Sequence, residues 1–169
     1  MRTIPDAEAV RRLPSPHAAE VTEDFIDYNG HMNITHYLRL GAEGVEAALM
    51  PLGINETHRR ERGLTMFSVE HHLNYFSEVH LGSRITVHPQ LLARSARTLH
   101  VVMYLLDATK DRLANTVEVL LAHVDMTTRR AVPFTPEIAA ALDAEIARHT
   151  AALEPFVSGS MGIRAASGG

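Results

Sequence analysis

Four long segments that favour β-strands follow one another from Leu64 onward, with only short polar breaks between them. They are rich in Val, Leu, Thr and aromatic residues, which suit a pleated surface. Parallel strands need crossover connections of about a dozen residues or more, and these breaks are too short to provide them. The sequence therefore predicts an antiparallel meander, with strands at 64–79, 84–93, 98–107 and 113–125.

A single long helix is predicted before the meander, over residues 33–50. Asn33 is a suitable N-cap residue, and Pro51 marks the end of the helix. Gly41 and Gly44 lie inside it, where each glycine costs about 1 kcal/mol relative to alanine. We expect the close approach of a sheet or of another helix to offset that cost.

The remaining segments complete an α+β domain. Val21 to Ile26 favours a short strand, 54–63 a loop or short helix, and 127–132 an extension of the last strand. Residues 135–153 carry apolar side chains at helical spacing and predict a second, amphipathic helix. We expect an irregular N-terminal lead-in at 1–17, one domain at 18–155 and a Gly- and Ser-rich flexible tail at 156–169.

The composition excludes several classes of protein. The chain has no cysteine, so disulfides, thiolate metal sites and cysteine nucleophiles are ruled out. Its formal net charge of -4 and the lack of a basic block argue against nucleic-acid binding. No apolar run approaches the roughly 20 residues of a membrane span and no signal-peptide pattern is present, so a cytoplasmic protein is expected. No two of the 11 histidines stand four residues apart on a helix with a carboxylate between them, the pattern that zinc hydrolases use, and we expect no metal.

Residues 27–33 read Asp-Tyr-Asn-Gly-His-Met-Asn and stand where the predicted helix begins. The N-terminus of a helix carries unpaired N–H groups and the positive end of the helix dipole. Such a place can stabilise a developing oxyanion. Asp27 would lie beside it as a nucleophile or general base, although Asp-x-Asn-Gly is also a favourable turn sequence in its own right.

This motif resembles the hallmark of hotdog-fold acyl-CoA thioesterases related to 4-hydroxybenzoyl-CoA thioesterase, through Asp27, Gly30, His31, Asn33 and Tyr37. Within that family the chain is most similar to the betainyl-CoA thioesterases of carnitine degradation, through residues 26–33, 36–37 and 69–75. The resemblance implies a long central helix wrapped by a five-stranded antiparallel sheet, plus a C-terminal helix. Ile34 replaces a second Asn of many general members, which favours the carnitine-type branch.

The resemblance also implies roles for the motif residues. In this family, the Asp at the position of Asp27 attacks the thioester carbonyl or activates water. Gly30 and His31 would supply backbone N–H donors to the thioester oxygen, and the His31 side chain could instead brace the loop. Asn33 is expected to cap the helix or to touch substrate. Asn29 would position water or Asp27, or only accept a turn conformation.

Glu70 lies on a predicted strand. An exposed strand at the sheet edge would pair with a second copy of the chain, and Glu70 could then meet the Asp27 loop of that copy. There it would be a second carboxylate or a counter-charge for substrate; alternatively, it is an ordinary exposed strand residue. A betainyl group carries a quaternary ammonium, which aromatic faces and a nearby carboxylate recognise. The candidates for such a cage are Tyr28, Tyr37, Tyr75, Phe67 and Phe76, with Glu70 or Glu43.

The resemblance therefore implies an acyl-CoA thioesterase that hydrolyses a small acyl-CoA, in particular betainyl-CoA, to the free acid and CoA. No cofactor is expected, because CoA is part of the substrate. An acyl-CoA-binding hotdog sensor without turnover and a hotdog dehydratase are the alternatives. A sensor would not need Asp27, and a dehydratase uses a His with an acidic residue on the opposing helix. We expect a homodimer or homotetramer that is active only when assembled.

Overall fold

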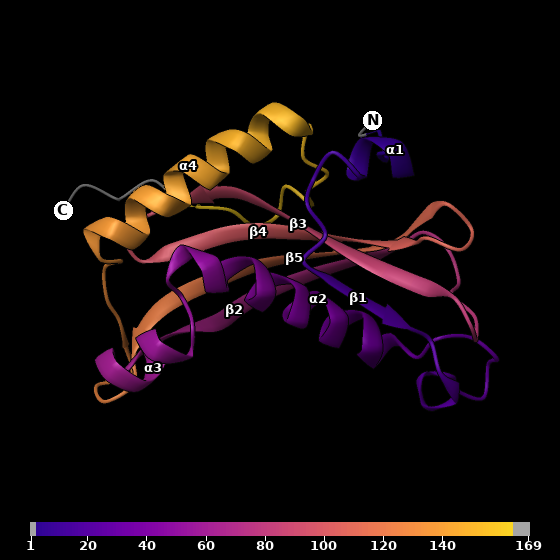
Figure 1. Ribbon diagram of the computed structural model, residues 1–169, viewed down its shortest axis with the longest axis horizontal. Coiled ribbons are helices and arrows are strands. Elements are labelled where there is room, and N and C mark those ends of the chain that lie inside the picture. The colour runs from indigo at the N-terminus through magenta and orange to yellow at the C-terminus, as the bar shows by residue number, and fades with distance from the viewer. Residues whose placement is uncertain (1–2, 164–169) are drawn as a thin grey trace.

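One long helix, α2 (Ile34–Leu49), lies against one face of a curved antiparallel sheet (Figure 1). The computed structural model describes residues 3–163. The strands are β1 (His17–Glu20), β2 (Leu64–Tyr75), β3 (Arg84–Arg94), β4 (Thr98–Asp107), β5 (Arg112–Asp125) and β6 (Arg130–Ala131). Their order in space is β1-β3-β4-β5-β2, with β6 paired to β5. The predicted sheet around a long helix is confirmed, and β6 adds a sixth, two-residue strand.

The other helices connect or flank this sheet. Helix α1 (Ala7–Val10) precedes β1, α3 (Glu56–Arg62) joins α2 to β2, and α4 (Pro136–Ala152) follows the last strand. The predicted C-terminal helix is α4, and its N-cap Thr135 accepts a hydrogen bond from Ile138 N. None of the helices in the described residues combines the length and the apolar character that a membrane span requires.

The strand predicted at 21–26 is wrong. Strand β1 ends at Glu20, and Glu23–Phe25 form a short 3-10 turn, η1. Thr22 Oγ1 donates a hydrogen bond to Asp24 Oδ1 at this turn. Local side-chain bonds of this kind compete with strand pairing, so the chain leaves the sheet edge here and turns toward the start of α2.

Both glycines inside α2 face the sheet. A Cβ added at Gly44 would lie 2.4 Å from Cγ1 of Val87 on β3, and one added at Gly41 would lie 3.1 Å from Cγ2 of Val117 on β5. A carbon–carbon separation of 2.4 Å is far inside the optimum of about 3.5–4.0 Å. The close approach of the sheet therefore explains two glycines that would otherwise only weaken the helix.

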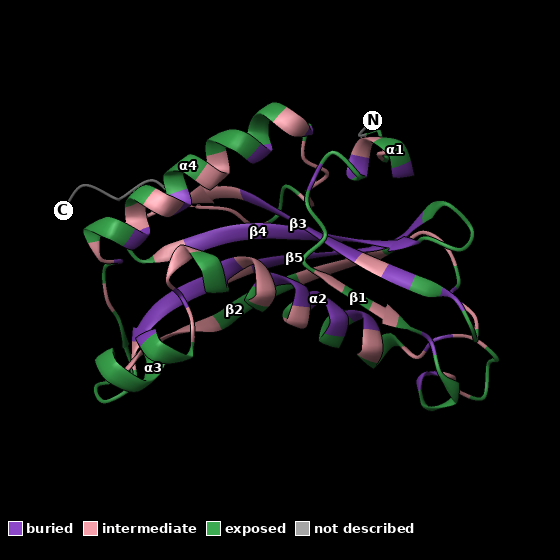
Figure 2. Ribbon diagram, in the orientation of Figure 1, coloured by how far each residue is buried: buried purple, intermediate pink, exposed green. Residues whose placement is uncertain are grey.

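The main core fills the space between α2 and the sheet. Tyr37, Leu40, Val45 and Leu49 of α2 are buried there against the strands. Figure 2 shows that β4 and β5 are mostly buried, whereas β2 has no buried residue along its length. A strand without buried residues is typical of a sheet edge.

The two edges of the sheet differ in their cover. Strand β1 pairs with the first residues of β3, and α4 packs along the rest of that strand. His149 Nδ1 on α4 accepts a hydrogen bond from Leu91 N at 3.0 Å, and Arg94 of β3 forms an ion pair with Asp143. On its outer side, β2 has no paired strand among the described residues. The first edge therefore offers only the 4 residues of β1, whereas the second offers the 12 residues of β2.

A second core lies on the sheet face opposite α2. Val102, Tyr104 and Leu106 of β4 are buried there beneath α1 and the segment that follows α4. The lead-in at 1–17, which we expected to be irregular, contains α1 and ends on the first residue of β1. Val10 of α1 is fully buried, so this part of the lead-in belongs to the folded domain.

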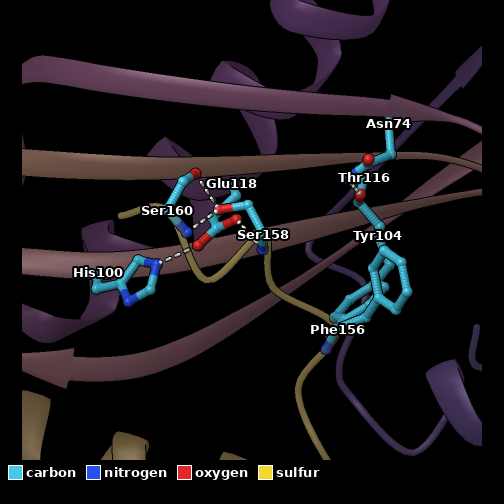
Figure 3. A network of polar contacts seen from close by, with 8 residues as sticks. All are labelled: Asn74, His100, Tyr104, Thr116, Glu118, Phe156, Ser158 and Ser160. Atoms are coloured by element: carbon cyan, nitrogen blue, oxygen red, sulfur yellow. Dashed lines mark hydrogen bonds and ion pairs between the residues drawn. The ribbon is translucent and has the colours of Figure 1, made fainter. Parts of the chain in front are cut away.

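Buried polar groups hold the segment after α4 on this outer face (Figure 3). Glu118 Oε1 lies 2.8 Å from His100 Nε2, and Glu118 Oε2 accepts a hydrogen bond from Ser158 N at 2.7 Å. Burial disfavours the charged carboxylate, but these hydrogen bonds outweigh it and lower the pKa of Glu118. The predicted flexible tail at 156–169 is described as far as residue 163, and residues 164–169 lie outside the described residues.

Candidate active site

The residues before α2 form a tight loop that a β-bridge between Ile26 and Met32 closes. Asp27 N donates a hydrogen bond to the His31 carbonyl at 3.2 Å, and Gly30 N donates to the Asp27 carbonyl at 2.9 Å. Gly30 has a φ of 80°, a left-handed conformation that glycine adopts without steric cost. The turn therefore accounts for the glycine of the motif.

Two hydrogen bonds hold the Asp27 carboxylate at the start of α2. Its Oδ1 accepts from Asn29 N at 2.8 Å, and its Oδ2 accepts from Asn33 Nδ2 at 3.1 Å. Asn33 is also the helix N-cap, as predicted, because its Oδ1 accepts from Thr35 N at 3.0 Å. The Asn33 side chain thus caps the helix and orients the carboxylate, whereas Asn29 acts through its main chain.

The backbone donors expected at Gly30 and His31 differ in availability. The Gly30 N–H already donates within the turn, whereas the His31 N–H has no hydrogen-bond acceptor among residues 3–163. The His31 ring lies 3.4 Å from the Met32 carbonyl through Nδ1, a contact that braces the loop. The free His31 N–H lies close to the N-terminus of α2, where the helix dipole favours negative charge.

The connection between β2 and β3 anchors this loop. Met32 N donates a hydrogen bond to the Val79 carbonyl at 2.8 Å, and His80 Nδ1 lies 3.4 Å from the Gly30 carbonyl. Residues just before Val79 therefore come close to the motif, although about fifty positions separate them in the chain.

A cavity of about 340 Å³ opens beside the loop, between α2 and the end of β2. Tyr37 of α2 and Tyr75 of β2 both line it, and their rings meet edge to face with centroids 5.2 Å apart. Burial raises the pKa of Tyr37 to about 12, so its hydroxyl stays protonated at neutral pH. His31, Phe76 and Glu78 also line the cavity.

The structure brings together only some of the predicted site residues. His31, Tyr37 and Tyr75 meet at the cavity. Tyr28 lies at the tip of the loop with 97% of its surface exposed and does not line the cavity. Glu70 is exposed on β2 beside a β-bulge and lies outside the cavity lining, because the strand end that borders the cavity begins at Tyr75.

Two further cage candidates are occupied elsewhere. The Glu43 carboxylate lies 3.0 Å from His17 Nε2 and 3.8 Å from Arg39 Nη1. The Phe67 ring lies under the guanidinium of Arg129, with 4.8 Å between the guanidinium carbon and the ring centroid. Neither side chain lines the cavity beside the Asp27 loop.

The sequence motifs alone indicate no role for Glu78. Glu78 and Val79 are among the residues that resemble the betainyl-CoA thioesterases, and Glu78 follows the aromatic end of a strand, in a Tyr-Phe-Ser-Glu run. That run reaches the cavity only because the following residue, Val79, is bound to the loop before α2. This is a contact across the fold that no local pattern reports.

A second cavity of about 540 Å³ lies at the opposite end of α2. Val45, Glu46 and Leu49 of α2, Arg59 of α3 and Met66 of β2 are among its lining residues. Since Tyr75 lies beside Tyr37 and Met66 lies beside Val45, β2 runs in the opposite direction to α2. The two cavities therefore mark the two ends of the open edge.

A carboxylate and a free N–H at a helix N-terminus are suited to reaction at a thioester carbonyl. Together with a curved antiparallel sheet around the helix, they define the class of hotdog-fold acyl-CoA thioesterases. Residues 21–142 match the profile of the Thioesterase-like superfamily, and the chain belongs to this family. The chain is therefore a thioester hydrolase that acts on acyl-CoA. Membership of this family favours hydrolysis over the two alternatives, an acyl-CoA sensor and a dehydratase.

Relatives of known name resemble the chain over most of its length. It is 30% identical to the betainyl-CoA thioesterase of Pseudomonas aeruginosa, over 78% of this chain and 82% of that protein. It is 34% identical to the L-carnitine dehydrogenase/betainyl-CoA thioesterase of Agrobacterium fabrum, over 88% of this chain but only 30% of that longer protein. A hypothetical protein of Staphylococcus aureus, solved in complex with CoA, shares the fold with a TM-score of 0.75 and 24% identity, over 88% of this chain and 93% of that one.

Proposed function

We propose that the chain hydrolyses betainyl-CoA to betaine and CoA, with Asp27 as the nucleophile or general base. The observation that carries this proposal is the Asp27 carboxylate, fixed by two hydrogen bonds in a loop whose His31 and Met32 line a cavity together with aromatic side chains. The names of relatives with 30% and 34% identity support the same acyl group. A betainyl group is small and cationic, and aromatic faces attract such a cation.

The reaction transfers the acyl group from sulfur to water. In one route Asp27 accepts a proton from the water that attacks the thioester carbon. In the other its carboxylate attacks that carbon to form an anhydride, which water then hydrolyses. In both routes the C–S bond breaks and the CoA thiolate takes up a proton. The carbonyl oxygen gains negative charge, which the His31 N–H and the N-terminus of α2 would stabilise.

A panel of acyl-CoA substrates tests the acyl group. We expect kcat/KM for betainyl-CoA to exceed that for acetyl-CoA and butyryl-CoA by at least about tenfold, because neutral acyl groups gain no cation–π attraction. Free CoA is measured with a thiol reagent, which the protein itself does not consume because it has no cysteine. Equal rates across the panel would contradict betainyl-CoA as the substrate.

The active unit that we propose is a homodimer paired along β2. Exposed apolar side chains are present on the two elements at this open edge, namely Ile34 and Leu38 on α2 and Val69 and Tyr75 on β2. Antiparallel pairing with the same strand of a second copy, about a two-fold axis near the strand midpoint, brings opposite strand ends together. The cavity beside Asp27 in one copy would then lie next to the α3 cavity of the other.

Val69→Lys is expected to give a folded monomer with little thioesterase activity, because a lysine on an edge strand opposes strand pairing. Light scattering measures the mass, circular dichroism the fold, and CoA release the activity. The control Ile4→Lys also replaces an exposed apolar residue, with 51% exposure against 65% for Val69, and should stay assembled and active. A fully active monomer would show that the site is complete within one chain.

A further inference from the structure

The cavity beside the Asp27 loop combines aromatic faces with one carboxylate. Tyr37, Tyr75 and Phe76 supply the aromatic surface, and Glu78 is the one acidic side chain among the described residues that line it. The whole chain contains 4 Tyr, 5 Phe and no Trp, so a third of its aromatic rings meet at this place. A surface of this composition is unusual for a chain that is poor in aromatic residues.

The Glu78 carboxylate has no permanent cation beside it. Within residues 3–163 its ion-pair partner is His80, whose Nε2 lies 3.8 Å away and is charged only when the ring is protonated. Arg112 binds the main chain of the same residue instead, since its Nη2 donates to the Glu78 carbonyl at 2.9 Å. This hydrogen bond fixes the backbone of Glu78 and leaves its carboxylate, which is 65% exposed, available at the mouth of the cavity.

Two other carboxylates on or just before α2 are already engaged. Asp27 accepts hydrogen bonds from Asn29 and Asn33, and Glu43 faces His17 and Arg39. By contrast, Glu78 combines a place in the cavity lining with a carboxylate that no arginine or lysine neutralises in the described part of the chain.

A quaternary ammonium has no N–H group, so a protein cannot recognise it by hydrogen bonds. It is bound by aromatic faces and by an uncompensated negative charge nearby. We propose that Glu78 is the counter-charge that selects a quaternary-ammonium acyl group, with Tyr75 and Phe76 as aromatic walls of the same subsite. This inference rests on the proposed function. It adds the residue that would recognise the charge of the acyl group, whereas the aromatic walls would also fit an uncharged group of the same shape.

His80 links this subsite to the reactive loop. Its Nδ1 lies 3.4 Å from the Gly30 carbonyl, and its Nε2 lies 3.8 Å from the Glu78 carboxylate. The same residue therefore contacts the loop that carries Asp27 and the side chain that would hold the cation. A bound ammonium group would then lie near the thioester carbonyl on which Asp27 is proposed to act, as the short betainyl chain requires.

Two substrates of the same shape test the proposal. In tert-butylacetyl-CoA a quaternary carbon replaces the quaternary nitrogen of betainyl-CoA, which removes the charge and keeps the size. Glu78→Gln is expected to lower kcat/KM for betainyl-CoA by about tenfold and to change that for tert-butylacetyl-CoA by less than about twofold. Tyr75→Leu should also reduce the preference for the cation, and Tyr75→Phe should restore it because the aromatic face returns.

The matched control is Glu8→Gln, which removes the same charge from an exposed position on α1, outside the lining of both cavities, and should alter neither rate. Equal losses for both substrates in Glu78→Gln would assign Glu78 a structural role and overturn the inference. An unchanged preference for betainyl-CoA in that variant would overturn it too, while the proposed substrate would stand. If the native enzyme hydrolyses both substrates equally, the proposed substrate fails, and the inference fails with it.

Discussion

Asp27→Asn is expected to lower kcat for thioester hydrolysis by about a thousandfold or more, while the chain remains folded and assembled. An amide neither attacks a carbonyl nor accepts a proton from water, so both possible routes lose their reactive group. The Asn29 N–H can still bond to the amide oxygen, but Asn33 Nδ2 would then face an NH₂ group instead of a carboxylate oxygen. We expect this lost hydrogen bond to cost about 1 kcal/mol of stability.

The two effects are measured separately, by release of CoA and by urea unfolding. Asp24→Asn is the matched control, because it changes an exposed carboxylate in the same segment that does not contact the loop hydrogen bonds of Asp27. This control should keep near-native turnover. Near-native turnover in Asp27→Asn would refute the assigned role of the carboxylate.

Gly44→Ala is expected to destabilise the protein by about 1–3 kcal/mol, the usual cost of overpacking a core. Alanine would improve the helix by about 1 kcal/mol in isolation, so a net loss reports the clash with the sheet. The added Cβ would lie 2.4 Å from Val87 Cγ1, and Val87 is fully buried on β3 with little room to move. The free energy of unfolding in urea measures the effect.

A double-mutant cycle separates the clash from other causes. Val87→Ala alone should destabilise the core because it leaves a cavity. In that background Gly44→Ala should become neutral or stabilising, since the methyl group it adds would occupy the space that the valine vacated. If Gly44→Ala costs the same free energy in both backgrounds, close packing against Val87 does not explain the glycine.

Local patterns in the sequence predicted most of the secondary structure. The strand at 98–107 agrees with β4 at both ends, and Asn33 caps α2 as expected. These features depend on residue type, spacing and short-range hydrogen bonds, which neighbouring positions report. The strand predicted at 21–26 is wrong because a short-range hydrogen bond was overlooked. The bond between Thr22 and Asp24 favours a turn in place of strand pairing.

The sequence predicted the motif of the site better than the full set of residues that line it. The motif at 27–33 predicted a loop that holds a carboxylate, and the structure places Asp27 there with two hydrogen bonds. It did not predict Glu78, because that residue reaches the loop through the bond between Met32 and Val79. The role predicted for Glu70 depends on a second copy of the chain, and the contacts within one copy leave it a prediction.

The unequal cover of the two sheet edges limits how copies of this chain can associate. The outermost strand at the first edge is β1, which is only 4 residues long, and α4 packs along the rest of β3, so the 12-residue β2 is the longer edge for strand addition in the described chain. Very short edge strands are one way in which proteins discourage strand addition. Association by backbone pairing along β2 therefore favours closure at two copies, because a two-fold pair presents only the short β1 edges at its outer ends.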